Sequence, residues 1–420
     1  MKFIVNGTAV GLVAAALSGL FLTGPPGASA AEASNAVLDI DQAVQTALAN
    51  NPGWAATRAQ ALATAEIPEQ AGALPDPWLT AEPGRADMSQ LKIGITQALP
   101  YPGKRNLARQ AAEYRAEAAG FEATEGALVL TAQVKQVWWR LFTIDRALEI
   151  HHRNLDVMRR LIRVAETRYR VGQGLQQDVL LAQLELSKLF EEEIGLDGER
   201  RVAVAKLNAL LDRSPATPVS LPVQTNENLP LVAQEQTLID RALATRPLLA
   251  AQQRQVDAAA AQADLARKDY RPDFMVGANY EWRDGSTDMK SAMFAMSLPL
   301  RPGSRQDRVV SQRNAELLMQ RYGLQDLEAR LAADVAAARA DYERAREQVG
   351  LVKNGVLPQA SLMVASMLAG YQVGKVDFLN LAGAQITVFE YEIRYWRALG
   401  DAWTALAQLI ATVGEEQVYE

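Results

Sequence analysis

Cysteine is absent from this sequence of 420 residues, and histidine occurs only at His151 and His152. The absence of cysteine excludes disulfides, thiolate metal sites, thiol catalysis and a lipid anchor on an N-terminal cysteine. Aromatic residues make up only 6% of the chain, and no run of lysine and arginine is interleaved with them. With a formal net charge of −6, the composition gives no reason to expect nucleic-acid binding.

Groups that carry chemistry are scarce as well. No set of histidine, aspartate and glutamate has the spacing of zinc ligands, and neither a Ser-His-Asp constellation nor a phosphate-binding loop can be assembled. We therefore expect no catalysis, no metal site and no cofactor. Met289, Met293 and Met296 carry thioethers, which suit copper(I), but Met293 and Met296 would point to opposite faces of a strand. Ordinary packing is the preferred interpretation of these methionines.

Long apolar runs are confined to the beginning of the chain. Lys2 is followed by an apolar stretch over 4–22, and Ala28-Ser29-Ala30 matches the small-residue pattern of a cleavage site. We interpret 1–30 as a signal peptide cut before Ala31, since the alternative, a membrane anchor, lacks a basic flank after the apolar run. No later apolar run approaches the about 18 residues that a membrane-spanning helix requires. The mature chain is therefore expected to be exported.

Two halves of the sequence repeat each other. The residues around a glycine turn in the first half recur 202 positions later in the second half, as Tyr169, Val171, Gly172, Ala182 and Gln183 and then Tyr371, Val373, Gly374, Ala384 and Gln385. The segment "LPYPGKR" at 99–105 is echoed by "LPLRPGSR" at 298–305. Pro75-Asp76 is likewise echoed by Pro272-Asp273. Internal repetition at several separate points indicates a duplicated architecture.

The repetition divides the mature chain into three parts. We predict a first structural repeat over 31–214 and a second over 236–420. Residues 215–235 between them contain four prolines and are predicted to be an irregular connector, because proline prevents a helix from continuing. Each repeat shows the same order of patterns, which is a helix, a short extended pair, a very long helix, a glycine turn and a long helix. The predicted fold is mainly α with a small β part.

A coiled-coil seam dominates the first repeat. From Val134 to Tyr169 the seam positions step by three and four residues without a fault, which predicts a coiled coil that ends at the glycine turn. His151 lies on this seam, where a polar core position is favoured over a metal ligand. A continuous helix from Gly103 to Arg170 would extend about 100 Å. In the second repeat the same step runs from Leu331 to Val356, until Pro358 interrupts it.

Alternating apolar residues predict strands within 272–299. This segment has a wholly apolar face and a more polar face on either side of a turn at 284–286. A period of two over about ten residues is typical of outer-membrane barrels, whose strands have one face toward lipid and one toward a wet lumen. The residues predicted to face lipid are Phe274, Val276, Tyr280, Trp282, Phe294, Met296 and Leu298.

The first-half pair of strands, predicted within 76–99, has a weaker pattern, so a soluble hairpin packed on a helix remains an alternative. Four strands cannot close a barrel, and an open sheet edge is not tolerated in lipid. Bacterial barrels made of one chain begin at about eight strands. Either the strands lie outside a membrane or several chains pool them, and three copies would give twelve.

The paired motifs resemble those of the TolC-like outer-membrane efflux proteins over essentially all of the mature chain. The resemblance rests on the duplicated halves, on the "LPYPGKR" and "LPLRPGSR" segments that lead from strands to helices, and on the "YRVGQG" and "YQVGKV" turns. The Pro-Gly-Lys-Arg segment is similar to that of the heavy-metal efflux subgroup. The resemblance implies a homotrimer whose twelve-stranded outer-membrane β-barrel is continuous with a trimeric periplasmic α-helical barrel, with an equatorial belt near the connector.

The same resemblance implies a function. Its members are passive exit ducts of tripartite efflux systems in the outer membrane of Gram-negative bacteria, joined through a periplasmic adaptor (membrane fusion protein) to an inner-membrane pump. The expected partners are therefore these two proteins, further copies of the chain and outer-membrane lipid, and heavy-metal cations are a possible substrate class. Two alternatives remain from the residues alone. An exported coiled-coil adaptor or scaffold without a barrel would not explain the apolar strand faces, and a soluble exported enzyme lacks any catalytic constellation.

The resemblance also assigns roles to the glycine turns near 169–178 and 371–380. They would be the periplasmic hairpin tips, where glycine lets the chain reverse and where the adaptor docks. The predicted docking residues are Tyr169, Val171, Gly172, Gln173, Tyr371, Val373, Gly374 and Lys375. A constriction held by carboxylates is expected near the second tip, but the better-known acidic positions are occupied here by Asn380 and Gly383. The candidates for the aperture are therefore Asp178, Asp377 and Asn380.

Overall fold

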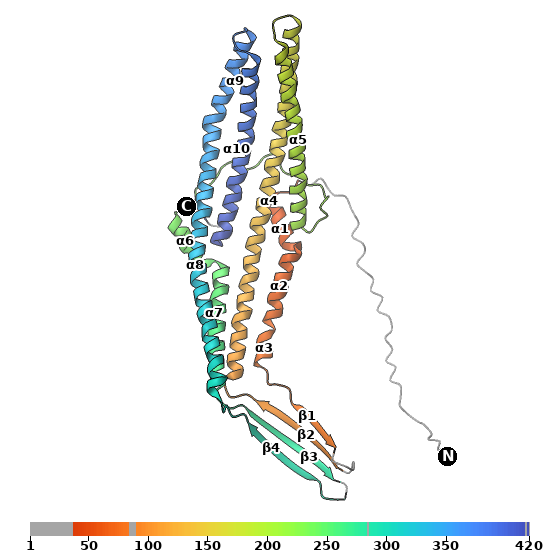
Figure 1. Cartoon of the computed structure of the whole chain (residues 1–420), viewed down its shortest axis with the longest axis vertical. Helices are drawn as coiled ribbons and strands as arrows, with labels where there is room; N and C mark the ends of the chain where they lie inside the picture. The colour runs from red at the N-terminus through yellow and green to blue at the C-terminus, as the bar shows by residue number, and fades with distance from the viewer. Residues whose placement is uncertain (1–36, 84–89, 284, 416–417, 420) are drawn as a thin grey trace, which may run out of the picture. The chain divides into compact units, whose positions relative to one another are not determined.

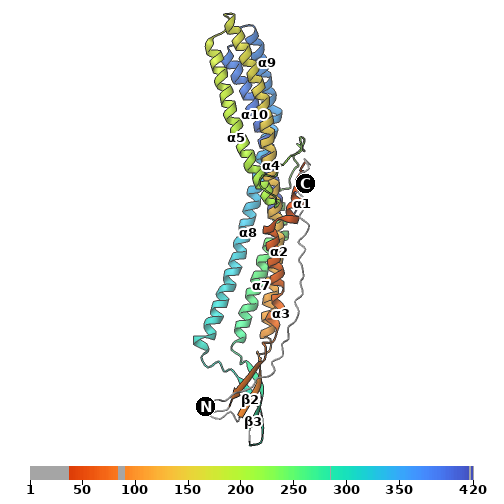
Figure 2. The same cartoon turned by 90° about the vertical axis from the view of Figure 1, so that its right-hand side faces the viewer.

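A computed structural model describes residues 37–83, 90–283, 285–415 and 418–419. The expected signal peptide over 1–30 lies outside these residues. The unit Val37–Glu420, taken by itself, consists of long helices with the two hairpin turns at one end and a small sheet at the other (Figures 1 and 2). None of the helices in the described ranges combines the length and the apolarity needed to cross a membrane.

The elements occur in a similar order in both halves of the chain (Figure 1). The first half contains α1 (Ile40–Asn50), α2 (Pro52–Ala65), α3 (Ile67–Gly72), β1 (Trp78–Pro83), β2 (Gln90–Leu99), α4 (Lys104–Arg170) and α5 (Gln176–Leu210). The second half contains α6 (Glu235–Thr245), α7 (Pro247–Lys268), β3 (Phe274–Arg283), β4 (Met289–Met296), a short 3₁₀ turn (Pro302–Ser304), α8 (Gln306–Leu351), a π-helical turn (Val352–Val356), α9 (Leu357–Gln372) and α10 (Phe378–Val413).

The longest helix, α4, has 67 residues and agrees with the helix predicted over 103–170. It begins after Gly103, whose φ of 91° lies in the left-handed region that favours glycine. The predicted seam is largely buried along its length, and His151 on that seam is only 1% exposed. At about 1.5 Å per residue, the helix extends about 100 Å.

The second long helix does not end at Pro358, contrary to the expected interruption. Instead the π-helical turn Val352–Val356 joins α8 to α9. Proline has no N–H to donate to the carbonyl four residues earlier, and a local widening of the helix accommodates that loss without breaking the rod. The same turn carries Lys353, whose Nζ lies 2.6 Å from a carboxylate oxygen of Glu227 in the connector.

No helix or strand lies between Leu210 and Glu235 apart from one isolated bridge at Val232. Side chains of the surrounding helices satisfy carbonyl groups of this connector, with donors from Arg146, Arg200, Asn208, Tyr342 and Trp403. Glu227 accepts hydrogen bonds from Lys353 and Tyr395, which hold the pKa of its carboxyl below the ordinary value. The irregular backbone is therefore held by side chains in place of a regular hydrogen-bond ladder.

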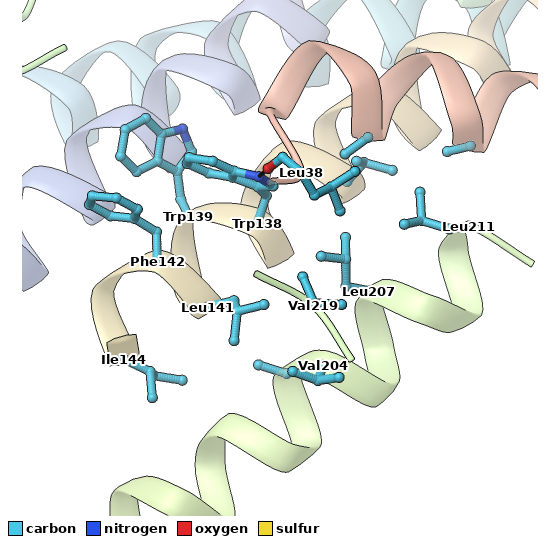
Figure 3. Packing of buried hydrophobic residues seen from close by; sticks show 14 of the residues in the cluster. Leu38, Trp138, Trp139, Leu141, Phe142, Ile144, Val204, Leu207, Leu211 and Val219 are labelled. Carbon is cyan, nitrogen blue, oxygen red and sulfur yellow. Dashed lines mark hydrogen bonds between the residues drawn. The ribbon is translucent and has the colours of Figure 1, made fainter. Parts of the chain in front are cut away.

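A cluster of aromatic side chains packs beside the connector (Figure 3). Trp139 of α4 stacks on Trp403 of α10, with ring centroids 5.5 Å apart and nearly parallel planes. Trp138 stacks on Phe142 and donates a hydrogen bond from its indole nitrogen to the carbonyl of Leu38, 3.0 Å away. These contacts join the N-terminal segment, the middle of α4 and the C-terminal helix.

The sheet has the order β1-β2-β3-β4, and all neighbouring strands are antiparallel. The apolar alternation of all four strands falls on one face, because Leu79 lies opposite Ile95, Ile95 opposite Ala278, and Ala278 opposite Ala292. The other face carries ion pairs of Lys92 with Glu82 and of Arg283 with Glu281. One face of the sheet is therefore apolar and the other polar.

Helices α4 and α10 approach closely at Gly400, where a Cβ atom would lie 2.2 Å from Cγ2 of Thr143. We expect Gly400→Ala to destabilise the protein by about 1–3 kcal/mol through overpacking. Gly383→Ala on the same helix is the matched control, because a Cβ there meets nothing within 4 Å, and it should be neutral or slightly stabilising. Thermal denaturation followed by circular dichroism measures both, and adding Thr143→Ala should relieve the Gly400→Ala defect. Equal effects of Gly400→Ala and Gly383→Ala would contradict the close packing.

Candidate functional site: the hairpin tips and the sheet

The two glycine turns have the same hydrogen-bond pattern. At each tip the N–H of the glycine donates to the carbonyl three residues earlier, and the next N–H donates to the carbonyl five residues before it. The donor–acceptor distances are 3.0 Å for Gly172 to Tyr169, 2.9 Å for Gln173 to Arg168, 3.1 Å for Gly374 to Tyr371 and 2.9 Å for Lys375 to Gly370. This pair of bonds is the Schellman motif that closes a helix at its C-terminus.

The motif requires a left-handed residue, and both glycines meet that need. Gly172 has a φ of 73° and Gly374 a φ of 75°. A side chain at either position would be strained, although a Cβ at Gly172 would have no atom within 4 Å. Geometry alone therefore explains why glycine stands at both turns. The open space at Gly172 means that only the backbone angle, and no packing contact, excludes other residues there.

The aperture candidates lie where the return helices begin. The side chain of Asp377 accepts a hydrogen bond from the backbone N–H of Asn380, 3.1 Å away, and so caps α10. Asp178 lies at the corresponding first turn of α5, with its carboxylate 3.5 Å from the N–H of Leu175. Asp377 and Asn380 are exposed, and Asp178 is half-buried. Both aspartates thus have a structural role, independent of any aperture.

The two tyrosines of the repeated turns lie in different surroundings, which the sequence repeat did not predict. Tyr169 is 47% exposed, whereas Tyr371 is 5% exposed and packs edge-on against Phe378. Arg168 also covers Tyr371, with its guanidinium 4.4 Å from the ring centroid and a 2.8 Å hydrogen bond to the Tyr371 carbonyl. Tyr371 therefore belongs to the core of the tip and does not form part of its surface.

Arg168 joins the two tips of one chain and was not singled out from the sequence. It stands at the end of α4, and its partner carbonyl stands at the end of α9. The guanidinium also lies 3.8 Å from where a Cβ of Gly374 would be. The exposed residues of the two tips, with this link between them, are Tyr169, Val171, Gly172, Gln173, Val373, Gly374 and Lys375.

His151 does not face a ligand. It is buried, and its Nε2 lies 2.6 Å from the carbonyl oxygen of Leu189. The neighbouring His152 is exposed and contacts Glu193 at 2.8 Å. Among the described residues, no group of three or more histidine, aspartate and glutamate side chains could hold a metal ion.

The apolar face of the sheet is open. Within the strands, the residues predicted to face lipid are between 38% and 68% exposed, with the exception of Phe274, which is half-buried and stacks on Phe294. Leu298 is exposed too, but it lies beyond the end of β4 at Met296. The polar residues of β3 on the opposite face are half-buried. The polarity of this sheet is the reverse of that of a water-soluble sheet, whose apolar face is the covered one.

A carboxylate ties the end of one hairpin to the beginning of the next. Asp273, just before β3, accepts a hydrogen bond from the backbone N–H of Tyr101, 2.8 Å away. Its carboxylate also forms an ion pair with Lys104 at 2.9 Å. Lys104 also reaches Asp269 at 2.9 Å. Burial alone would lower the pKa of Lys104, but these two hydrogen bonds raise it above the ordinary value. The "PYPGKR" segment after β2 is thus fixed by the second half of the chain.

Comparison with known proteins agrees with this geometry. Residues 238–415 match the family model described as outer membrane efflux protein. The cobalt-zinc-cadmium resistance protein CzcC of Cupriavidus metallidurans is 24% identical over 353 residues, which cover 82% of this chain and 82% of CzcC.

Solved structures show the same fold. A crystal structure of CusC, described in connection with folding and transmembrane channel formation, has a TM-score of 0.79 at 15% identity and covers 90% of this chain and 92% of its own. The outer membrane protein VceC of Vibrio cholerae has a TM-score of 0.76 at 18% identity, covering 90% and 96%. Residues 238–415 of the chain thus match the outer membrane efflux protein family, and most of the chain has the fold of these solved structures and is similar to the heavy-metal resistance protein CzcC.

Proposed function

We propose that three copies of this chain form one exit duct. Their sheets would combine into a twelve-stranded outer-membrane barrel, and their helices would continue it as an α-helical barrel in the periplasm. Substrates would pass through it from an inner-membrane pump and a periplasmic adaptor to the outside, without catalysis by this chain. The observation that carries the proposal is the inverted polarity of the sheet, with exposed apolar residues on one face and ion pairs on the other.

The physical argument concerns both faces and both edges of the sheet. An exposed face of Ile93, Ile95, Tyr280 and Phe294 is unfavourable in water and favourable in lipid. In lipid, however, the outer edges of β1 and β4 must be paired, because unsatisfied backbone groups cost several kcal/mol each. Closure with further copies of the same sheet meets both requirements. The alternative, an exported coiled-coil adaptor without a barrel, does not explain an exposed apolar face on the sheet.

Heavy-metal cations are the substrate class that we propose. The support is the similarity to CzcC, whose name assigns it to cobalt, zinc and cadmium resistance. A passive duct requires width and suitable charge, so it needs no fitted metal site. This agrees with the function of a channel whose specificity is set by the pump and the adaptor.

We further propose that the exposed tip residues form the docking surface for the adaptor. Both tips expose a mixture of apolar and polar groups at one end of the long helices. These groups belong to Tyr169, Val171 and Gln173 on the first tip and to Val373 and Lys375 on the second. An aperture at the same end would be formed by Asp178, Asp377 and Asn380. The cap at the start of α10 would then hold Asp377 in a fixed position.

The face assignment gives one test. Phe294→Arg should impair insertion into the outer membrane, at a cost of about 2–4 kcal/mol near the midplane, because this side chain is 68% exposed on the apolar face. Ala295→Arg is the matched control, since the next residue of the strand points to the polar face. Quantitation of folded protein in outer-membrane fractions measures both. Equal losses for the two variants would refute the assigned lipid-facing side.

The tips give a second test. Gly374→Val and Gly172→Val would each incur about 1–2 kcal/mol from a positive φ. They should leave trimer level and outer-membrane location nearly normal, while export and cross-linking to the adaptor are lost. Gly285→Val is the matched control, because Gly285 has the same φ of 75° in open space but lies in the turn of the second strand pair.

The measurements for the tip variants are metal sensitivity of the cells and cross-linking in whole cells. Gly285→Val should transport normally, because its backbone strain is the same and its place is different. Normal transport by Gly374→Val would show that the turns are only connections between helices. Loss of assembly in Gly374→Val would also contradict the docking proposal, because the defect would then lie in folding.

A further inference from the structure

The junction between the two halves of the sheet shows how one hairpin meets the next. β2, the last strand of the first hairpin, pairs with β3, the first strand of the second, over ten residue pairs from Gln90 with Arg283 to Leu99 with Phe274. In the described strands, the far edge of β1 and the far edge of β4 have no neighbour. An isolated edge strand is a template for pairing with another chain.

The sequences of the two hairpins can be aligned by two repeated pairs of residues. Pro75-Asp76 and Pro272-Asp273 are 197 positions apart and precede the first strand of each hairpin. Leu99-Pro100 and Leu298-Pro299 are 199 positions apart and mark the end of the second strand of each hairpin. These two shifts define which residues of the second hairpin correspond to residues of the first.

The observed registers agree with these shifts. Moving the β1–β2 pair of Trp78 and Thr96 by 197 and 199 positions gives Met275 and Ala295, which are paired in the β3–β4 hairpin. The pair of Leu79 and Ile95 likewise gives Val276 and Phe294, which are also paired. The two hairpins therefore have equivalent registers, although their strands differ in length.

The same shifts can be applied to the residue pairs between β2 and β3. They then give the pairs expected between β4 of one copy and β1 of the next. The β2–β3 pair of Gln97 and Val276 becomes Met296 of one copy and Leu79 of the next. The pair of Thr96 and Gly277 becomes Ala295 and Thr80. Met296 and Leu79 are both exposed, at 52% and 76%. In this register the apolar face of β4 continues into the apolar face of β1.

Asp273, the carboxylate at the junction between β2 and β3, corresponds to Asp76 at the outer edge of the sheet. Asp273 holds the Tyr101 N–H and Lys104 after β2, and the repeat places Asp76 at the equivalent point before β1. Pro102-Gly103 and Pro302-Gly303 are 200 positions apart, so Arg301, directly before Pro302, stands at the equivalent of Tyr101, directly before Pro102. Asp76 and Arg301 are both exposed, and in the described chain neither side chain has a hydrogen-bond or ion-pair partner. Each chain thus carries one half of a contact at either edge of its sheet.

We propose that β4 of one subunit pairs with β1 of a second copy in the register that sets Met296 opposite Leu79 and Ala295 opposite Thr80. Asp76 of the partner subunit then receives the backbone N–H and the guanidinium of Arg301 after β4. The proposal rests on the assembly described under the proposed function and specifies its junction. The contact closes the sheet and fixes the segment from which α8 begins.

The absence of cysteine makes the register directly testable by disulfide cross-linking. Four double variants use the same four positions: Met296→Cys with Leu79→Cys, Ala295→Cys with Thr80→Cys, and the crossed pairs Met296→Cys with Thr80→Cys and Ala295→Cys with Leu79→Cys. Directly opposed side chains in antiparallel strands have Cβ atoms about 4.5–5.5 Å apart, which is close to disulfide geometry. In the crossed pairs the two side chains lie on opposite faces.

Oxidation of outer-membrane fractions and non-reducing electrophoresis give the result. We expect linked dimers and trimers from at least one matched pair, because one of the two is the closer, non-hydrogen-bonded kind, and none from the crossed pairs. Linking of a crossed pair in a protein that is still trimeric would overturn the register alone. A monomeric protein with no linked pair would overturn the register and the proposed assembly together.

A charge exchange tests the second part of the proposal. Asp76→Arg and Arg301→Asp should each reduce the amount of trimer that resists dissociation in detergent, and the double variant should restore most of it. Asp334→Arg, which makes the same charge change at an exposed aspartate of α8, away from the sheet, is the control and should leave that amount unchanged. A double variant no better than the worse single variant would overturn the contact between Asp76 and Arg301.

Discussion

Backbone hydrogen bonding at the two outer strands is the constraint on which the rest of this structure depends. A sheet with an exposed apolar face is suited to lipid, yet lipid offers no partner for the free N–H and C=O groups along β1 and β4. The chain cannot satisfy these groups by itself, because its own four strands do not close. The polar face with its ion pairs and the carboxylate that joins successive hairpins fit the proposal that the sheet continues into further copies.

Long helices connect the sheet with the two hairpin tips. α4 runs without a break from the end of β2 to the first tip, so the position of that tip is set by the strand that precedes it. In the second rod, the helical hydrogen-bond pattern changes to that of a π-helix just before Pro358. This π-helical turn places Lys353 beside Glu227 of the connector. Arg168 then joins the two tips to each other. Continuous helices thus lead from the sheet to the tips, where we propose that the adaptor docks.

Much of the fold was predictable from the sequence, because its signals are periodic and local. The seam from Val134 onward predicted the course of α4, and the paired turns at Gly172 and Gly374 have the positive φ that their glycines permit. The remainder depends on contacts between residues far apart in the chain. The burial of Tyr371 is set by Arg168, which lies 203 positions earlier, so the repeat alone indicated equal roles for two tyrosines that differ. Leu298 continued the alternation, but the last residue pair of the hairpin is Phe274 with Met296, and beyond it the backbone N–H of Ser297 makes one more bond, to the carbonyl of Asp273, before the chain leaves the sheet.

Hydrogen–deuterium exchange of the protein in outer-membrane vesicles tests the central claim most directly. In a closed sheet every strand is paired on both sides, so the amides of β1 and β4 should exchange as slowly as those of β2 and β3. If β1 and β4 instead show rapid exchange of the amides that point away from their neighbours, while β2 and β3 remain protected, the sheet has open edges. That result would contradict a barrel shared between copies.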